Sequence, residues 1–148
     1  MELFRSPAFT TYALFASGLC LLLLLIDASS GAARAGSKTT PNAEDLGSVS
    51  RGATLAADDP ESVARVLRAH RNALANIVPF LFVMLLYVAL GASKTWVLGL
   101  CGVFTAARLV HAVAYIKGLQ PWRTLSFAVG QTCTGIVMVQ VVRAALAA

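Results

Sequence analysis

The stretch ALANIVPFLFVMLLYVALGA, residues 73–92, carries no charged side chain. A helix needs about 20 apolar residues to cross the hydrocarbon core of a bilayer, and this stretch has that length. Three further stretches are long and apolar enough in the same sense, at residues 8–26, 95–116 and 124–142. The pattern therefore predicts four membrane-spanning helices.

The composition of the whole chain agrees with a membrane protein. Of the 148 residues, 57% are hydrophobic and only 13% are charged, which departs strongly from the average of soluble domains. A soluble core of this size could not bury so much apolar side chain. We therefore expect a single all-α domain over residues 1–148, folded as an integral membrane four-helix bundle.

The first apolar stretch, residues 8–26, has two possible interpretations, a retained membrane span or a secretory signal. A secretory signal is the alternative for residues 8–26, because small residues follow the leucine run. The uncharged stretch is longer than a typical signal core, which favours a retained span.

Residues 28–59 are rich in Gly, Ser, Ala and Thr and predict a long polar loop. Asp58, Asp59 and Pro60 then predict the start of the second helix.

Charge is distributed unevenly along the chain. All 7 acidic residues lie at or before Glu61, whereas eight of the 12 Lys and Arg residues follow it. An ionisable group inside a membrane costs about 2.5–3.5 kcal/mol and normally finds a partner. The last three helices offer no carboxylate, so the counter-charge must come from the first loop, from lipid headgroups or from a bound anion.

The short connections at residues 91–94 and 117–123 make neighbouring helices antiparallel. The first and third loops then share one side of the membrane, which carries most of the Lys and Arg residues. The positive-inside rule places that side in the cytosol and both termini on the other side. The membrane is expected to be the bacterial inner membrane or the endoplasmic reticulum.

Two polar stripes run towards this basic side at helical spacing. The second helix contributes Arg65, Arg68, Asn72 and Asn76, and the third contributes Arg108, His111 and Tyr115. The fourth helix begins near Arg123. The stripes predict a basic pocket that opens on lipid and suits an anionic cofactor together with a lipophilic substrate.

Structural roles are the alternative for several of these residues. Lys and Arg near helix ends can reach lipid headgroups as simple anchors, which applies to Arg65, Lys94, Lys117 and Arg143. Asn72, Asn76, Gln131 and Thr134 can serve as hydrogen-bonding links between helices. The sequence shows no metal-ligand spacing and no Ser-His-Asp set, and its three cysteines are isolated. We expect no metal and no nucleic-acid partner.

Several motifs resemble those of the MAPEG superfamily, the membrane-associated proteins of eicosanoid and glutathione metabolism. Residues 68–82, RAHRNALANIVPFLF, resemble its second-helix motif, and residues 108–115, RLVHAVAY, resemble its third-helix motif. Residues 120–130, QPWRTLSFAVG, are similar to the start of the fourth helix in microsomal glutathione transferases. Residues 41–45, PNAED, loosely match the first-loop motif.

The resemblance implies a homotrimer that binds glutathione at each subunit interface and acts on a lipophilic substrate. It implies an Arg-stabilised glutathione thiolate, with Arg123 as the catalytic residue and Thr124 where the prostaglandin E synthase branch carries a serine. The cofactor-binding residues that it implies are Arg34, Arg68, Arg71, Asn72, Arg108, His111, Tyr115 and Arg123. The expected activity is that of a glutathione transferase or peroxidase for lipophilic electrophiles or lipid hydroperoxides.

The chain departs from the family pattern at one point. The family motif continues with acidic residues after Asn72, one of which receives the glutathione amino group, but Ala73 and Ala75 stand here. Glu44 or Asp45 of the first loop is the candidate substitute. Two other activities stay open: a glutathione-dependent isomerase of the prostaglandin E synthase kind, and a non-catalytic lipid-binding or scaffold protein.

Overall fold

The computed structural model describes residues 2–147 and consists mainly of four long helices. They are α2 (Pro7–Ser37), α3 (Glu61–Ala89), α4 (Lys94–Lys117) and α5 (Trp122–Leu146). A short helix, α1 (Glu2–Arg5), precedes them. Each long helix is sufficiently long and apolar to cross a membrane. The predicted all-α membrane bundle of four helices is confirmed.

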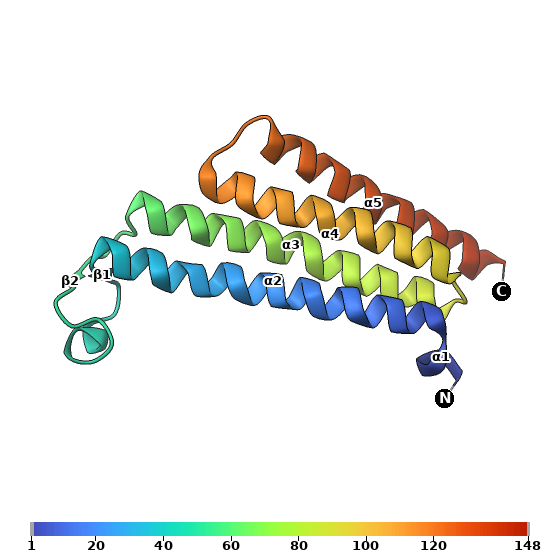
Figure 1. The fold of residues 1–148 in the computed structure, drawn as a ribbon, viewed down its shortest axis with the longest axis horizontal. Coiled ribbons are helices and arrows are strands. Elements are labelled where there is room, and N and C mark those ends of the chain that lie inside the picture. Colours follow the sequence, from blue (N-terminus) through green and yellow to red (C-terminus); the bar gives the residue numbers. More distant parts are fainter. Residues whose placement is uncertain (1, 148) are drawn as a thin grey trace.

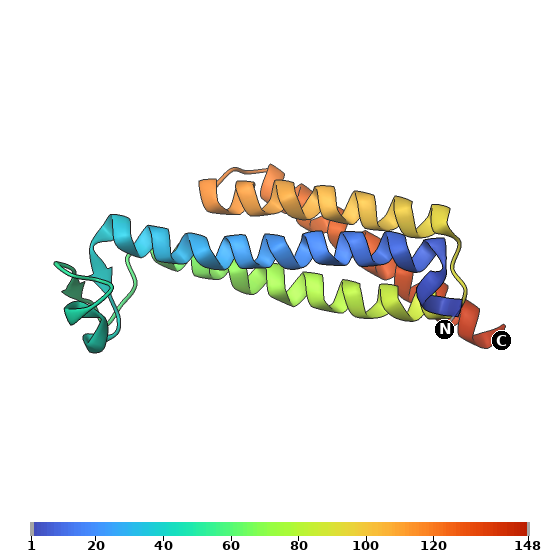
Figure 2. The same ribbon diagram turned by 60° about the horizontal axis from the view of Figure 1, so that its bottom comes forward.

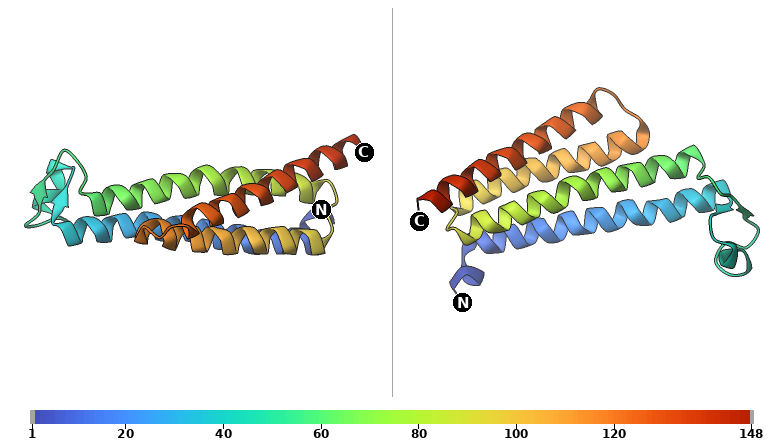
Figure 3. Two further views of the ribbon diagram at one scale, coloured as in Figure 1. Left: turned by 90° about the horizontal axis from the view of Figure 1, so that it is seen from above. Right: turned by 180° about the vertical axis from the view of Figure 1, so that it is seen from behind.

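The helices run alternately up and down, so each is antiparallel to the next (Figure 1). Helix α2 packs against both α3 and α4, and α5 packs against α3 and α4 on the other side (Figure 2). Viewed from above, α5 runs obliquely across the bundle (Figure 3). The two described chain ends lie at one end of the bundle, and the first loop lies at the other.

The prediction that residues 28–37 belong to the first loop is wrong, because α2 continues to Ser37. Four of these ten residues are alanine, the best helix former, and extending a helix that already exists costs less than starting one. The helix ends at Lys38, whose left-handed φ of 51° lets its N–H bond to carbonyls of the last turn. Helices α2 and α3 consequently extend past the loop between α4 and α5 (Figure 1).

The first loop is a small closed structure. Strand β1 (Thr39–Thr40) pairs in parallel with β2 (Thr54–Leu55), and the 3-10 helix η1 (Ala43–Gly47) lies between them. The expected aspartate cap of α3 is wrong, since Pro60 is the N-cap residue and no side chain caps the helix. Asp59 instead accepts a hydrogen bond from Arg34 Nη1 at 2.5 Å. The loop is therefore tied to the end of α2.

The core runs along the centre of the bundle. The rings of Phe80 on α3 and Phe104 on α4 stack with centroids 3.7 Å apart. Many large apolar side chains point outward instead, including Leu24, Val78, Leu109 and Val139. An apolar exterior of this extent would be unfavourable in water and is what a bilayer requires.

Candidate functional site

Arg108 is the least expected side chain in the interior, because it is only 2% exposed in the middle of an apolar helix. Its Nη2 donates to the backbone carbonyls of Ser126 at 3.1 Å and Phe127 at 3.4 Å. The guanidinium also lies over the rings of Phe104 and Phe127, at 5.5 and 5.9 Å. Arg108 therefore links α4 to the backbone of α5.

Gly130 makes room for this guanidinium. A Cβ added at Gly130 would lie 2.9 Å from both Cζ and Nε of Arg108, closer than real Cβ contacts. Only glycine lets the two helices approach with the arginine between them. Glycine is needed at this position because the Arg108 guanidinium lies so close to the Gly130 backbone, and not because of the backbone conformation of Gly130.

His111, one turn further along α4, contacts the next section of α5. Its Nδ1 lies 3.0 Å from the carbonyl oxygen of Arg123, which is an acceptor, so Nδ1 carries the proton and donates it. The Ser126 hydroxyl lies 3.3 Å from the same nitrogen and also donates to the carbonyl of Trp122 at 2.6 Å. His111 therefore fixes the first turn of α5 beside Arg123.

Three buried nitrogen atoms of this pair have no hydrogen-bond partner among the described residues. They are Nε and Nη1 of Arg108 and Nε2 of His111. Unsatisfied polar atoms in a protein interior are costly.

The side chain of Arg123 is held at the mouth of this cluster. Its guanidinium lies over the ring of Tyr115 at 5.1 Å, and that ring meets His111 edge-on at 5.6 Å. Oriented to satisfy both neighbours, the Gln120 amide accepts from Arg123 Nη2 at 2.8 Å and donates to Thr124 Oγ1 at 3.0 Å. Among the described residues, no carboxylate lies within 4 Å of Arg123.

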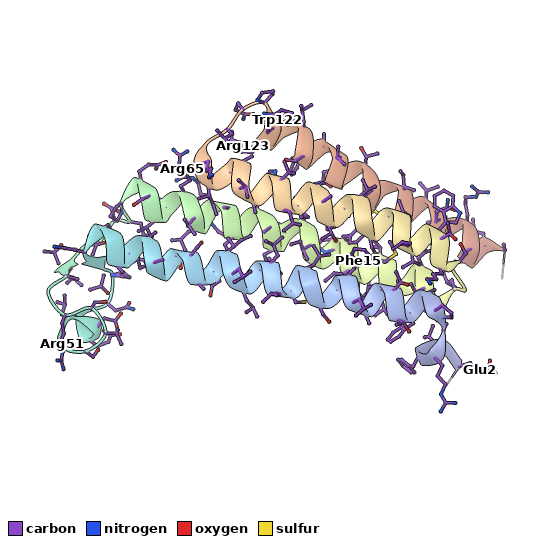
Figure 4. The ribbon with its side chains drawn as sticks, viewed as in Figure 1. Glu2, Phe15, Arg51, Arg65, Trp122 and Arg123 are labelled. Carbon is purple, nitrogen blue, oxygen red and sulfur yellow. The ribbon has the colours of Figure 1, made fainter. Side chains whose placement is uncertain are left out.

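The first turns of α3 bring two more arginines to the same end of the bundle (Figure 4). Glu61 accepts from Arg65 at 3.1 Å and from Arg68 at 2.8 Å. The hydrogen bond from Arg68 holds the pKa of Glu61 below its usual value, and the charges of both arginines add to this. The guanidinium of Arg65 also lies against Gly118, where α4 ends with a left-handed φ of 69°.

A chain of amides joins α3 to α5 further along the bundle. The side-chain nitrogen of Asn76 donates to the carbonyl of Asn72 at 2.7 Å, and Gln131 donates to Asn76 Oδ1 at 2.8 Å. Asn76 and Gln131 therefore link two helices, as the alternative role predicted, whereas the Asn72 contact stays within α3. Thr134 does not, because its hydroxyl bonds within its own helix to Gly130.

The single chain thus brings together only part of the predicted set. Arg108, His111, Tyr115 and Arg123 form one cluster between α4 and α5, which we call the α4–α5 cluster. Arg68 and Asn72 lie on α3, where Arg71 is exposed on the outward face, and Thr124 is exposed beside Gln120. Arg34 lies near the first loop, bound to Asp59.

Ser126, Gln120 and Glu61 are site residues that the sequence pattern did not predict. Ser126 lies three residues after Arg123, so helical spacing could have placed it on the face that meets His111. Gln120 lies two residues before the start of α5, and Glu61 is the first residue of α3. Asp45, considered as a substitute for the missing acid, accepts bonds from Thr40 and Asn42 within the first loop.

The fold and this cluster define a class: an integral membrane protein of four helices, with cationic and aromatic side chains gathered at the end that carries the first and third loops. The MAPEG family model matches residues 12–143. The chain belongs to the MAPEG family, which confirms the resemblance that its motifs indicated.

Individual relatives match over most of their length. Microsomal glutathione S-transferase 1 of Sus scrofa is 34% identical, over 90% of this chain and 88% of that protein. The protein of the same name from Mus musculus is 36% identical, over 86% and 82%. Prostaglandin E synthase of Equus caballus is 35% identical over 84% of both chains.

Proposed function

We propose that this protein is a glutathione-dependent membrane transferase or peroxidase that acts on lipophilic electrophiles or lipid hydroperoxides. The observation that carries the proposal is the state of Arg123. Its guanidinium is positioned by Tyr115, Gln120 and the His111 contact to its backbone, yet no described carboxylate neutralises it. An anionic ligand would neutralise Arg123, and the relatives named glutathione S-transferase support glutathione as that ligand.

The charges of the chain fit most of a glutathione molecule. Its two carboxylates supply the negative charge that α3, α4 and α5 lack after Glu61, and Arg68 and Arg71 are the candidate donors to them. Its ammonium group finds no acid at Ala73, which is buried, or at Ala75, which is exposed. The anionic part therefore fits the residues present, and the ammonium contact is missing on α3.

Bound glutathione supplies a sulfur nucleophile. A free thiol has a pKa of about 8.5, and a neighbouring guanidinium favours its thiolate form, which is the reactive one. Arg123 has that role in the proposal. Arg108 and His111 are positioning residues, because both bind the backbone of α5 and not the open face of the site.

The lipid-facing surface beside the cluster suits a lipophilic substrate. A groove of about 750 Å³ runs between α4 and α5, and apolar residues such as Leu100, Val103, Leu125 and Ile136 line it. No charged side chain lines this groove. A substrate dissolved in the bilayer would reach it without crossing water.

We also propose that the protein works as a homotrimer with a shared site. Arg34 belongs to the last turn of α2, and this end of α2 extends beyond the α4–α5 loop (Figure 1). If Arg34 binds glutathione together with Arg123, the two residues must come from neighbouring subunits. The loop end would face the cytosol, where glutathione is available.

The catalytic assignment is tested by replacing Arg123 with Ala and with Lys. We expect Arg123→Ala to abolish turnover of a lipophilic electrophile while glutathione still binds, and Arg123→Lys to retain part of the activity. Arg143→Ala, on the far end of the same helix, is the matched control. Unchanged turnover in Arg123→Ala would refute the assignment.

A glutathione-dependent isomerase is the second candidate, because relatives named prostaglandin E synthase match equally well. The two activities differ in stoichiometry, since a transferase or peroxidase consumes the thiol and an isomerase does not. Counting free thiol during turnover of an endoperoxide substrate separates them.

Ala75 favours a third candidate, a non-catalytic lipid-binding member of the family. This candidate requires that glutathione does not bind. Calorimetry with glutathione, followed by mass analysis of the lipid that copurifies with the protein, decides between this candidate and the two glutathione-dependent enzymes.

A further inference from the structure

A cavity with basic residues at its rim lies at the opposite end of the bundle, where the two described chain ends lie (Figure 1). It measures about 590 Å³ and is formed by α1, the first turns of α2 and the start of α4. Two basic residues, Arg5 and Lys94, line it together with the apolar side chains of Leu14, Phe15 and Leu98. The proposed glutathione chemistry uses none of these residues.

The electrostatic environment of this cavity is positive. No carboxylate of the described residues lies within 4 Å of Arg5 or Lys94, and no acidic residue lines the cavity. Helices α2 and α4 run in the same direction, so both of their positive dipole ends lie here. The hydroxyls of Thr10 and Thr11 donate to carbonyls of their own helix, which leaves the two basic side chains as the charged donors.

The remaining lining is apolar and points towards the bilayer. Leu14 is 71% exposed and Leu98 is 49% exposed. Phe15 lies between α2 and α4, where a Cβ on Gly102 would be 4.0 Å from its ring (Figure 4). The cavity therefore combines a cationic rim with an apolar floor.

We propose that this cavity binds an anionic phospholipid. The headgroup phosphate lies between the guanidinium of Arg5 and the ammonium of Lys94, and one acyl chain lies over Leu14, Phe15 and Leu98. Basic residues that merely reach for water need not line a common cavity, whereas Arg5 and Lys94 both line this one. A free phosphate would satisfy the rim alone, so the acyl chain distinguishes the two sources.

Native mass spectrometry of the detergent-purified protein tests the site, with phosphatidylglycerol as the probe. Each of Arg5→Gln and Lys94→Gln should weaken retention of the lipid about fivefold, the loss expected for one basic residue at an anionic membrane surface. Arg143→Gln, a basic residue at the same end that does not line the cavity, should leave retention unchanged. Equal loss in all three variants would overturn the proposal, because it would reveal only nonspecific attraction.

Two further probes separate the headgroup from the chain. Phosphatidylcholine, which is zwitterionic, and inorganic phosphate should each bind more weakly than phosphatidylglycerol. Inorganic phosphate binding as tightly as the lipid would overturn the acyl-chain part of the proposal. Since thiolate formation at the other end does not depend on this cavity, Lys94→Gln should retain it, and the two proposals fail independently.

Discussion

Arg108 carries a local energetic cost, because its guanidinium is buried and two of its nitrogen atoms have no partner among the described residues. Two carbonyl bonds and two aromatic rings offset part of that cost. What the chain gains is a fixed α5, since Arg108 and His111 together hold the backbone at Arg123, Ser126 and Phe127. We infer that this positioning keeps the Arg123 guanidinium aimed at the site.

Replacing Gly130 with Ala tests the positioning role. The new Cβ would displace the Arg108 guanidinium, and overpacking of this kind costs about 1–3 kcal/mol. Turnover should fall while Arg123 itself is intact, and the melting temperature should drop. Gly135→Ala, on the same helix with open space around it, should be neutral or slightly stabilising. Full activity in Gly130→Ala would contradict the role assigned to Arg108.

Replacing Ala75 with Glu tests the missing ammonium contact. The new carboxylate would lie one turn after Arg71 and restore the acid of the family motif, so glutathione affinity should rise about tenfold. Calorimetry measures the change, and Ala75→Gln is the control without a charge. No gain in Ala75→Glu would mean that another group receives the ammonium, or that glutathione does not bind beside Asn72.

Glu61 forms an ion pair with Arg68. The resemblance to the family motif implies that Arg68 binds glutathione, so Glu61 competes with the cofactor for this side chain. Glu61→Gln should free Arg68 and tighten glutathione binding at neutral pH. Because the pKa of Glu61 is lowered, the carboxylate stays charged to lower pH than usual, and the pairing is lost only as the pH falls through that lowered pKa. The wild type should therefore keep the competing pair across the neutral range, and weaker binding in Glu61→Gln would contradict the competition.

At the scale of single residues, the sequence predicted on which face of a helix a side chain lies better than what that side chain touches. Helical spacing correctly placed Arg108, His111 and Tyr115 on one stripe. It could not reveal that Arg108 is enclosed, since enclosure depends on Gly130 of another helix. Nor could it reveal the partner of Asp59, because the pairing with Arg34 spans a loop.

Among the elements, α2 shows why the boundaries were harder to predict than the spans. The four apolar stretches were evident because each must match the thickness of a membrane. Residues 28–37 are polar enough to read as a loop, yet they propagate the helix because nothing in them stops it before Lys38. The first loop then closes through backbone pairing of β1 with β2, for which the sequence has no strong signal.

The Arg34–Asp59 pair connects this extended end of α2 to the start of α3. Both side chains are about a quarter exposed, so the pair should contribute about 1 kcal/mol or less. A double-mutant cycle with Arg34→Gln and Asp59→Asn, read by thermal unfolding in detergent, measures that coupling. A coupling of several kcal/mol would show that the pair is a principal support of the loop.

For the whole molecule, the proposal that Arg34 and Arg123 bind the same glutathione calls for a second subunit, because Arg34 is in the last turn of α2 and Arg123 is in the first turn of α5. Mixed oligomers of Arg34→Ala and Arg123→Ala chains test this requirement. If each variant alone is inactive and the sites are shared around a trimer, random mixing should restore about a quarter of the native sites. Activity no higher than that of the separate variants would place both residues in one subunit, or Arg34 outside the site.

The central claim is that the protein binds glutathione and that Arg123 stabilises its thiolate. The most direct test is to titrate the purified protein with glutathione and to monitor the thiolate by ultraviolet difference absorbance. We predict a saturable signal in the wild type that is lost in Arg123→Ala and kept in Arg143→Ala. Absence of the signal in the wild type, together with no heat of binding, would contradict the claim and leave the lipid-binding alternative as the function.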